Sequence, residues 1–422
     1  MSLLVTNDVS LTEKLCGFDF TVYWILDSLA KNDEIFKEQF AKKTITKVNA
    51  RDISANKGFF STVLKIELVF HDGTKYTTIL KIPGTESFAA AKITENVEDI
   101  KLGASTLTDS IIRMHDTECD FYENVAYLIP EILPKVHKFK RWVKGVHIGC
   151  LHMEDLSVKG RNLDYFDGLT VPQFKNVIDW LAYFHSKLLT TDTWQDKFTK
   201  QGKIFSQMRE MFKTGFNKSV DIVRTGKEKF ESLIHDERIQ KILYNQEFID
   251  YAFFESYRDF GLPKLLVHSD LWASNMIFEA NEEGDATDKV SAVLDWQITF
   301  EGNFLFDFAR LMICSLEGDI RREMEEIIFD FYVTRLNKYL KENGGKEVTF
   351  TPADVKRTYE HMFLAHFGHG IIMFGGIFKG RSRDLDKDKV ELARLEKCTL
   401  RSIHFLEDVI NLLESGKFDR WL

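Results

Sequence analysis

The alternation of apolar and polar residues divides the chain into a strand-rich first third and a helix-rich remainder. Two runs, FFSTVLKIELVF and KYTTILKIP, alternate with the period of two that is typical of strands. They flank residues 71–74, whose Asp-Gly pair is typical of a tight hairpin turn. Before them, apolar residues recur at helical spacing from Phe18 to Phe40. The pattern therefore predicts an N-terminal helix followed by an antiparallel sheet.

The rest of the first third completes this sheet. TITKV predicts a further short strand, and KVHKFKRWV and VHIGCLHMEDL predict two strands joined around Lys144-Gly145. SIIRMHDTECDFYENVAYLIP predicts a helix that stops before Pro130. Residues 84–108 are polar, small and mixed, so we expect a long loop or a short helix over the sheet.

After Asp155 the pattern becomes helical, with one exception. VPQFKNVIDWLAYFHSKLL, residues 195–260 and the chain from Phe304 onward all favour helices. Between them, LVHSDLWASNMIF and VSAVLDW predict a short strand–loop–strand unit. Strands gathered first and helices afterwards favour a two-lobed α+β protein.

Composition narrows the class of protein. The 422 residues carry a net charge of −9, which argues against a nucleic-acid binder. Five scattered cysteines without CxxC spacing indicate reduced thiols. The N-terminus lacks the pattern of a secretory signal, and the apolar run GIIMFGGIF is too short to cross a bilayer. We expect a cytoplasmic protein without a membrane span; the pattern says nothing about oligomeric state.

One constellation of polar residues indicates chemistry. His268, Asp270 and Asn275 lie within eight residues between two predicted strands, and Asp295 follows another strand. Two carboxylates and an amide oxygen are hard ligands suited to Mg²⁺ carried on phosphates. One carboxylate would remain to orient an attacking hydroxyl. The alternative is a polar turn that contains an incidental aspartate.

These residues resemble a known family. HSDLWASN with VLDWQ is similar to the catalytic loop and metal motif of the aminoglycoside phosphotransferase and choline kinase-like superfamily. The resemblance is greatest to the ecdysteroid-kinase-like (CHK kinase-like) family of arthropods and nematodes, which MEDLS and VLDWQITFEGNFLFDFARLM match in order and spacing. It implies a protein-kinase-like bilobal α+β fold, with an antiparallel-sheet N-lobe at residues 1–152 and a helical C-lobe at 153–422.

The resemblance also implies roles for the constellation. Asp270 would orient or deprotonate the hydroxyl of the acceptor, and Asn275 and Asp295 would bind Mg²⁺. His268 would pack beneath the loop and hold its backbone by hydrogen bonds.

A strand lysine and a helix glutamate form a second expected group. Period-two alternation puts Lys81 and Ile79 on one face of their strand, and the resembled kinases use such a lysine to contact the α- and β-phosphates of ATP. Lys65 is the rival, since it also lies in a strand among apolar residues. The family spacing selects Glu118 rather than Glu123 as the partner that orients Lys81.

The loop that would cover the phosphates departs from the kinase pattern. Protein kinases use several glycines there, whereas SANKGFFSTVLKI holds only Gly58. Ser61 or Thr62 would then hydrogen-bond a phosphate, as small polar residues do in the resembled family.

HMEDLS resembles the segment that joins the two lobes in this fold. There adenine would be held by backbone groups of Glu154 and Leu156, with Met153 beside it.

Several other residues have competing interpretations. His361, His366 and His369 lack HExxH spacing, so we do not predict a metal site there. Asp307 resembles the residue that braces the catalytic loop, but a helix N-cap fits it almost as well.

Three tryptophans, Trp194, Trp272 and Trp296, are candidates for an aromatic wall that faces a choline-like cation. Choline kinases carry a different sequence after the metal aspartate, however, which weakens the assignment of choline as the acceptor.

The sequence as a whole predicts an ATP-dependent phosphotransferase that moves the γ-phosphoryl group of Mg·ATP to a small-molecule hydroxyl. Sterol-like, choline-like and sugar acceptors all remain open, and residues 195–260 with the C-terminal helices would wall the acceptor site. The alternative is a catalytically silent nucleotide-binding scaffold, which the single glycine of the phosphate loop favours. A protein kinase is disfavoured because no APE motif follows Asp295.

Overall fold

The computed structural model divides into two compact units. It describes residues 4–54, 60–84, 101–102, 105–199, 209–223, 228–379 and 388–422. The first unit is Met1–Lys159 and the second is Gly160–Leu422. The boundary predicted from the sequence, between residues 152 and 153, lies inside the last strand of the first unit and stays a prediction.

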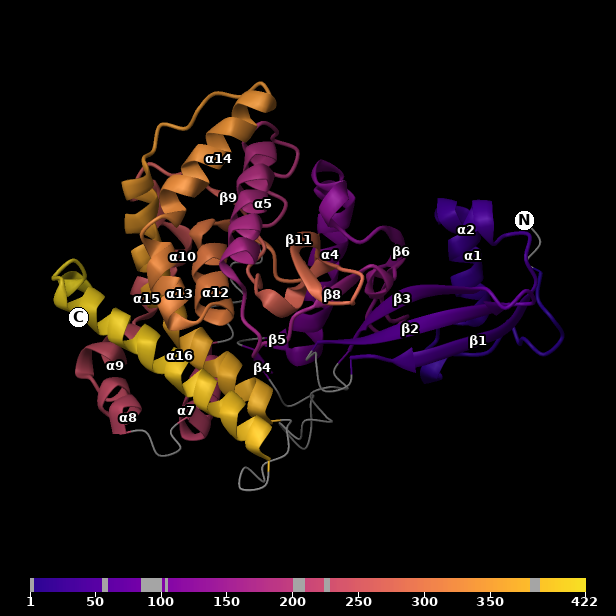
Figure 1. The fold of residues 1–422 in the computed structure, drawn as a ribbon, viewed down its shortest axis with the longest axis horizontal. Helices are drawn as coiled ribbons and strands as arrows, with labels where there is room; N and C mark the ends of the chain where they lie inside the picture. Colours follow the sequence, from indigo (N-terminus) through magenta and orange to yellow (C-terminus); the bar gives the residue numbers. More distant parts are fainter. Residues whose placement is uncertain are drawn as a thin grey trace. The chain divides into compact units, whose positions relative to one another are not determined.

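The first unit is built on a five-stranded sheet of order β1-β2-β3-β7-β6 (Figure 1). All neighbouring strands pair antiparallel. Its strands are β1 (Ile45–Asp52), β2 (Ser61–Phe70), β3 (Lys75–Pro83), β6 (Val136–Lys140) and β7 (Cys150–Glu154). The turn between β2 and β3 contains Gly73 at φ 79°, a left-handed conformation that glycine adopts without steric cost. The predicted hairpin is confirmed.

The two faces of this sheet carry different kinds of side chain. One face of β2 and β3 packs leucine, isoleucine and phenylalanine side chains, such as Leu64 and Leu80, against helix α1 (Val22–Asn32). The opposite face carries Lys65 and Lys81, and helix α4 (Leu107–Asn124) contacts it. The period-two pattern therefore separates a core face from a face that presents charged groups.

The core on the first face is continuous. Ile66, Leu68 and Phe70 of β2 and Ile82 of β3 are fully or almost fully buried there. Burial of such side chains stabilises the unit by roughly 1.5–3 kcal/mol for each of them. This core holds β3 in place, and β3 in turn fixes the direction of its outward-facing lysine.

The predicted N-terminal helix is two helices. α1 ends at Asn32, and α2 (Glu34–Gln39) begins directly afterwards. The break occurs because the Asp33 carboxylate accepts hydrogen bonds from the backbone N–H groups of Ile35 and Phe36, which makes Asp33 an N-cap. The helix predicted to stop before Pro130 also ends earlier, at Asn124, and short 3₁₀ turns follow it.

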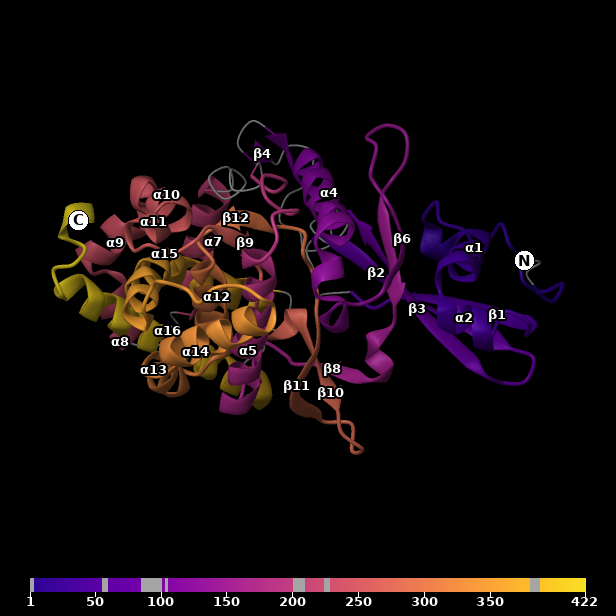
Figure 2. The same cartoon turned by 90° about the horizontal axis from the view of Figure 1, so that it is seen from above.

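The second unit consists mainly of helices, as the sequence predicts. Helices α5 and α14 pack side by side, and the long helix α15 packs against α7 and α12 (Figures 1 and 2). Its principal helices are α5 (Val171–Leu189), α7 (Arg209–Val223), α8 (Glu228–Ile234), α9 (Glu237–Tyr244), α10 (Gln246–Phe254), α11 (Ser256–Asp259), α12 (Leu305–Ser315), α13 (Gly318–Glu325), α14 (Ile328–Glu342), α15 (Pro352–Lys379) and α16 (Lys389–Glu414). None of the helices in the described ranges has an apolar stretch long enough to cross a bilayer.

Two small antiparallel sheets lie among these helices. β10 is the central strand of the order β11-β10-β8, and β12 pairs with β9. Their strands are β8 (Gly160–Asn162), β9 (Leu265–Val267), β10 (Met276–Ala280), β11 (Ala286–Val293) and β12 (Phe300–Gly302). The strand–loop–strand unit predicted from the sequence is therefore larger than expected, because β8 and β12 are too short to leave a period in the sequence.

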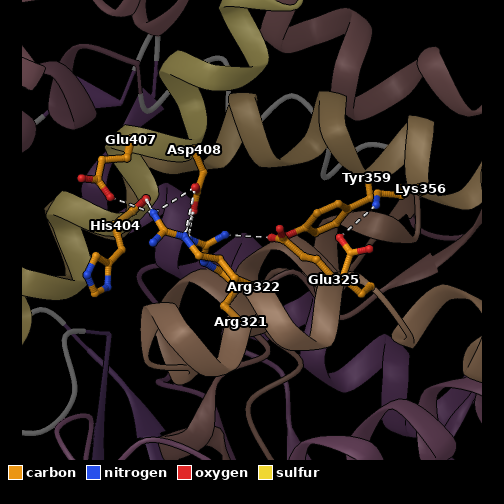
Figure 3. Close-up of polar contacts among 9 residues, drawn as sticks. Arg321, Arg322, Glu325, Lys356, Tyr359, His404, Glu407 and Asp408 are labelled. Atoms are coloured by element: carbon orange, nitrogen blue, oxygen red, sulfur yellow. Dashed lines mark hydrogen bonds and ion pairs between the residues drawn. The ribbon is translucent and has the colours of Figure 1, made fainter.

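An ion-pair network fastens α13 to α16 (Figure 3). Arg321 is buried and pairs with Glu325 of its own helix at 2.8 Å and with Asp408 of α16. Arg322 pairs with Asp408 at 3.0 Å and with Glu407 at 2.8 Å. Because both guanidinium groups are matched by carboxylates in a network, we interpret this cluster as a structural clamp between two helices of the second unit.

Candidate active site

The loop at residues 268–275 connects β9 to β10 and has an unusual backbone. Ser269 has a φ of 68°, and Asp295, which follows β11, has a φ of 70°. Left-handed conformations are uncommon for residues other than glycine, and such strain gathers at functional sites because surrounding contacts must hold it. The side chain of Ser269 supplies one of these contacts, since its hydroxyl donates to the carbonyl of Ile298 at 2.6 Å.

Asp307 of α12 holds the start of this loop. Its carboxylate accepts the backbone N–H groups of His268 and Ser269, each at 2.8 Å. It makes no capping bond to its own helix, so the N-cap interpretation is wrong and the bracing interpretation describes the geometry. Burial raises the pKa of Asp307 to about 7, although the two backbone N–H groups act in the opposite direction.

His268 supports the loop from within. Its ring is fully buried, and Nδ1 accepts the backbone N–H of Asp270 at 3.2 Å. Nε2 then carries the proton and donates to the carbonyl of Leu294 at 2.9 Å. Trp296 packs against the ring with centroids 4.4 Å apart. This is the backbone-holding position that the sequence analysis expected, and it leaves no ring nitrogen for proton transfer.

Asp270 is held on both carboxylate oxygens. Arg310 of α12 donates from Nη2 to Oδ1 at 2.6 Å, and Asn275 donates from Nδ2 to Oδ2 at 2.9 Å. A charge-assisted bond on one oxygen and an amide on the other fix the orientation of the carboxylate. The side chain keeps partial exposure, so a hydroxyl group can approach it.

Sequence reasoning did not identify Arg310. Arg310 follows Asp307 by three residues on α12, a spacing that puts two side chains on the same side of a helix. Asp307 contacts the backbone of the loop and Arg310 contacts its aspartate, so one helix face serves the whole loop. That spacing is the signal that would have found Arg310.

The hairpin of β10 and β11 brings Asn275 and Asp295 to the same end of the small sheet. Met276 pairs with Val293, and the backbone carbonyl of Asn275 accepts the N–H of Leu294 at 2.8 Å. The Asn275 amide nitrogen is bound to Asp270, which fixes the amide and leaves its oxygen as the group that can bind a cation. An amide oxygen with carboxylates is the donor set that Mg²⁺ prefers, so these residues fit the expected metal.

Lys81 and Glu118 form an ion pair in the first unit. Nζ of Lys81 lies 2.7 Å and 2.9 Å from the two carboxylate oxygens of Glu118, whose side chain is 2% exposed. Glu123, the other candidate on α4, is exposed and pairs with Arg141. The structure thus brings together the two residues that the sequence analysis paired, and their role toward a nucleotide stays a prediction.

The rival lysine also has a partner. Lys65 of β2 lies 2.7 Å from Asp155, and its Nζ donates to the hydroxyl of Ser157 at 2.8 Å. Both lysines lie on the same face of the sheet, but their carboxylates come from different segments. Lys65 fastens β2 to the end of the first unit, whereas Lys81 faces a helix.

The remaining nucleotide-binding candidates lie at the ends of strands. Ser61 begins β2 opposite Pro83, two residues along the strand from Val63, which pairs with Lys81. Ser61 therefore shares a face with that lysine. Gly58 lies outside the described residues, so the phosphate loop itself stays a prediction.

The segment expected to hold adenine lies at the end of strand β7 and in the turn that follows it. Met153 and Glu154 end β7, and Leu156 begins a short 3₁₀ turn. The backbone N–H of Glu154 donates to the carbonyl of Lys135 at 3.0 Å, so only its carbonyl is a candidate for adenine. Met153 is buried.

The tryptophan wall considered from the sequence is wrong for two of its three members. Trp194 and Trp296 are almost fully buried, and their indole N–H groups donate to backbone carbonyls of Leu188 and Val293. They are core residues because their rings pack within the unit. Trp272 is half-buried and lies on the loop between Asp270 and Asn275.

Comparison with known proteins supports both the family and the fold. The DUF1679 family, described as "Uncharacterized oxidoreductase dhs-27", matches residues 32–417. Two relatives from Caenorhabditis elegans are similar in sequence. "Uncharacterized oxidoreductase dhs-27" is 22% identical over 83% of this chain, and "Uncharacterized kinase-like protein D1044.1" is 23% identical over 61% of it. The matched regions make up 41% and 66% of those proteins, respectively, so the chain spans less than two thirds of either.

A solved structure shows the same fold. The choline kinase from Cryptosporidium parvum Iowa II aligns with 94% of this chain and 97% of its own, with a TM-score of 0.50 and 11% identity. The expected kinase-like α+β fold, with an antiparallel sheet in the first unit and helices in the second, is confirmed. From the match over most of its length, the chain belongs to the DUF1679 family.

Proposed function

We propose that this chain is an ATP-dependent phosphotransferase that moves the γ-phosphoryl group of ATP to a hydroxyl group of a small molecule. The observation that carries the proposal is the geometry of Asp270. Its carboxylate is fixed by Arg310 and Asn275 on a loop whose strained backbone is held by Asp307. Strain that the surrounding structure holds in place is typical of functional sites.

In the proposed reaction, each group of residues has a separate role. Asp270 orients the acceptor hydroxyl and takes its proton as the bond to phosphorus forms. Lys81, held by Glu118, contacts the phosphates of ATP, and Ser61 hydrogen-bonds one of them. Backbone groups of Glu154 and Leu156 hold adenine beside Met153. Catalysis then comes mainly from positioning ATP and the acceptor hydroxyl, because the protein forms no covalent bond in this phosphoryl transfer.

Asn275 and Asp295 are the residues that would hold Mg²⁺. When bound, Mg²⁺ neutralises charge on the phosphates of the nucleotide. The chain's own contribution is to keep the two oxygen ligands in place, through the bond from the Asn275 amide to Asp270 and the backbone pairing of β10 with β11. Gln297 adds to this by donating to the Asp295 carboxylate at 3.2 Å.

The names of the relatives point in two directions. One nematode relative is called kinase-like and the similar solved structure is a choline kinase, whereas the other relative is called an oxidoreductase. The chain contains no Gly-x-Gly-x-x-Gly sequence, the fingerprint of many dinucleotide-binding oxidoreductases. The site residues support phosphoryl transfer, and membership of the ecdysteroid-kinase-like group within this fold is part of the proposal.

The proposal can be tested by thermal unfolding with Mg²⁺ alone, ATP alone and both together. A ligand that binds only the folded state stabilises it by about 2.7 kcal/mol at a hundredfold excess over its Kd. We expect wild-type protein to gain stability only with Mg²⁺ and ATP together, and Asp295→Asn to lose most of this gain. Asp419→Asn, which changes an exposed aspartate, is the matched control and should behave as wild type.

Binding alone does not distinguish an enzyme from a silent scaffold. Mg·ATP-loaded protein is therefore incubated with a panel of small alcohols, and ADP formation is measured. Formation of ADP that depends on an alcohol and is lost in Asp270→Asn supports the phosphotransferase. Nucleotide binding without any such transfer would favour the scaffold, and absence of the Mg·ATP gain in wild type would refute both.

A further inference from the structure

The catalytic loop, residues 268–275, is held at its two ends by different elements. Asp307 and Arg310 of α12 hold the first half. The second half is a single 3₁₀ turn, Ala273–Asn275, which ends at the proposed metal ligand. A turn of this length contains few hydrogen bonds of its own, so contacts from outside the turn fix the direction of Asn275.

Asn162, the last residue of β8, supplies such a contact. Its Nδ2 donates to the backbone carbonyl of Ser274 at 3.0 Å and to that of Met276 at 2.9 Å. Both partners are carbonyl oxygens, which only accept, so the nitrogen of the amide faces them and provides one hydrogen for each. The two carbonyls belong to the residues on either side of Asn275. One side chain therefore holds the backbone before and after the proposed ligand.

The pairing of β8 with β10 puts Asn162 at this position (Figure 2). The two strands are antiparallel, and Asn162 pairs with Ile277, next to the start of β10 at Met276. Gly160 permits the close approach of the strands, because a Cβ atom there would lie only 2.8 Å from the carbonyl oxygen of Phe278. The strand pairing ends at Asn162, and its side chain continues the hydrogen bonding into the turn.

Helix α12 also holds the turn. Ser315, the last residue of that helix, is buried, and its hydroxyl oxygen accepts the backbone N–H of Ala273 at 2.9 Å. The Ser274 hydroxyl adds a bond to the carbonyl of Leu163 at 3.0 Å. Loss of the contacts from Asn162 would therefore leave the turn attached to the unit, and only the end that carries the proposed ligand would be released.

The bonds of Asn162 matter more for position than for stability. Asn162 is exposed, so water can replace either bond, and their net contribution to the free energy of unfolding is small. The Asn275 amide nitrogen is bound to Asp270, which leaves its oxygen for a cation. A shift of the backbone at Asn275 would move that oxygen. Mg²⁺ demands nearly ideal octahedral geometry, so a displaced ligand weakens its binding.

We propose that Asn162 is a positioning residue for the metal site. By holding the backbone on both sides of Asn275, it raises the affinity of the protein for Mg·ATP and does not itself bind the metal, the nucleotide or the acceptor. This inference rests on the proposed phosphotransferase function. Residues that hold metal ligands in place typically change metal affinity by about 10–100-fold, and Asn162 acts in this way through the backbone of the ligand.

The test replaces Asn162 by leucine, which has nearly the same size and shape but donates no hydrogen bond. Isothermal titration calorimetry measures the Kd of Mg·ATP, and we expect Asn162→Leu to raise it by at least about tenfold. Asn176→Leu is the matched control. Asn176 is also exposed, and its Nδ2 donates to the backbone carbonyl of Asp288 on β11, in the same small sheet, at 2.8 Å. This control should leave the Kd unchanged.

A double-mutant cycle shows whether Asn162 acts through Asn275. Asn275→Ala removes the amide oxygen and should itself raise the Kd of Mg·ATP. In that background Asn162→Leu should change the Kd by less than about twofold, because effects that act through one residue do not add. A tenfold rise in both backgrounds would mean that Asn162 acts elsewhere, and it would overturn the inference.

Two measurements on protein without ligand separate positioning from a structural role. Hydrogen exchange in a peptide that covers residues 271–276 should be faster in Asn162→Leu than in wild type or Asn176→Leu, because the turn opens more often. The urea midpoints of the two leucine variants should be alike, since each variant loses only bonds of an exposed amide. A much lower midpoint for Asn162→Leu would show that Asn162 serves the fold, which contradicts the inference.

The outcomes distinguish this inference from the proposed function. Binding of Mg·ATP by wild type, with the same Kd in Asn162→Leu, overturns the positioning role and leaves the phosphotransferase intact. Absence of Mg·ATP binding by wild type refutes the phosphotransferase, and the positioning role falls with it.

Discussion

The two units position their candidate functional residues in different ways. In the first unit, Lys81 and Glu118 lie on a regular strand and a regular helix, and their directions follow from the period of each element. In the second unit, Asp270 lies on an irregular loop whose direction depends on contacts from α12. Regular elements orient a side chain through their own backbone, whereas the loop needs contacts from residues far along the chain.

The difference also appears in what each arrangement leaves ambiguous. A strand repeats every two residues, so Lys65 and Lys81 share a face and each finds a carboxylate. A loop has no period, so no second aspartate competes with Asp270 for the same role. The residues that hold the loop, Asp307 and Arg310, lie far along the chain.

The largest effect is expected for the loop aspartate. Asp270→Asn keeps the shape of the side chain and the bond from Asn275 to the backbone carbonyl, but it removes the charge that takes the hydroxyl proton and one of the two oxygens that accept from Arg310 and Asn275. Loss of a general base typically lowers the rate by about 10²–10⁴-fold. ADP formation in the presence of an alcohol acceptor measures it, and the Mg·ATP stability gain should persist because Lys81 and Asp295 are unchanged.

A surface control distinguishes an effect at the loop from a general effect of removing one carboxylate. Glu414→Gln changes an exposed carboxylate that pairs with Arg238 on the surface, and it should keep the full rate. An Asp270→Asn enzyme that retains wild-type turnover would show that the loop aspartate has no role as a base.

The second effect concerns the support of the loop. Asp307→Ala leaves the backbone N–H groups of His268 and Ser269 buried without an acceptor. Each unpaired donor costs about 1–3 kcal/mol, so we expect a loss of roughly 2–4 kcal/mol in the free energy of unfolding. Urea denaturation measures this loss. A change below about 1 kcal/mol would mean that the loop does not depend on Asp307.

Sequence reasoning recovered the local part of each arrangement. The strands of the hairpin at Gly73 follow from the period-two pattern. The pairing of Lys81 with Glu118, 37 positions apart, was expected only from the family resemblance. The constellation of Asp270 with Asn275 follows from a short segment. Local patterns of this kind survive in the sequence because neighbouring residues create them.

The non-local part was missed for a physical reason. Arg310 and Asp270 are 40 positions apart in the chain, and no pattern within the loop sequence indicates that Arg310 is its partner. The burial of Trp194 and Trp296 likewise depends on which helices surround them, so an aromatic residue in the sequence does not reveal whether it faces a ligand or the core. Tertiary packing decides both.

The third effect is a dependence on pH in the first unit. His115 of α4 is buried, and burial lowers its pKa to about 4. In the unfolded chain a histidine has a pKa of about 6.5, so between these values only the unfolded state binds the proton. Stability contributed by neutral His115 is present above about pH 6.5 and is lost as pH falls toward 4, by about 3 kcal/mol in total.

Chemical denaturation of wild type and His115→Gln across this range measures the effect. The variant should show a smaller slope of unfolding free energy with pH, because glutamine does not titrate. Equal slopes for the two proteins would contradict the prediction.

The smallest effect separates the two strand lysines. Lys81→Met and Lys65→Met each leave a carboxylate without its lysine, Glu118 or Asp155, so both should destabilise the first unit. Only Lys81→Met should weaken Mg·ATP binding, by at least about tenfold, because a charge-assisted bond to phosphate is worth about 1.5–3 kcal/mol. The Mg·ATP stability gain of each variant measures this, and a larger loss in Lys65→Met would reverse the assignment.

The bond of Asp307 to the catalytic loop has a consequence for amide hydrogen exchange. Loop amides usually exchange early, because local openings expose them to water. The amides of His268 and Ser269 are instead buried and bound to a carboxylate on α12, so they exchange only when the loop separates from that helix. Two amides of an irregular segment should therefore exchange as slowly as those in the centre of α12, and the catalytic loop belongs to the same cooperative unit as the helix beneath it.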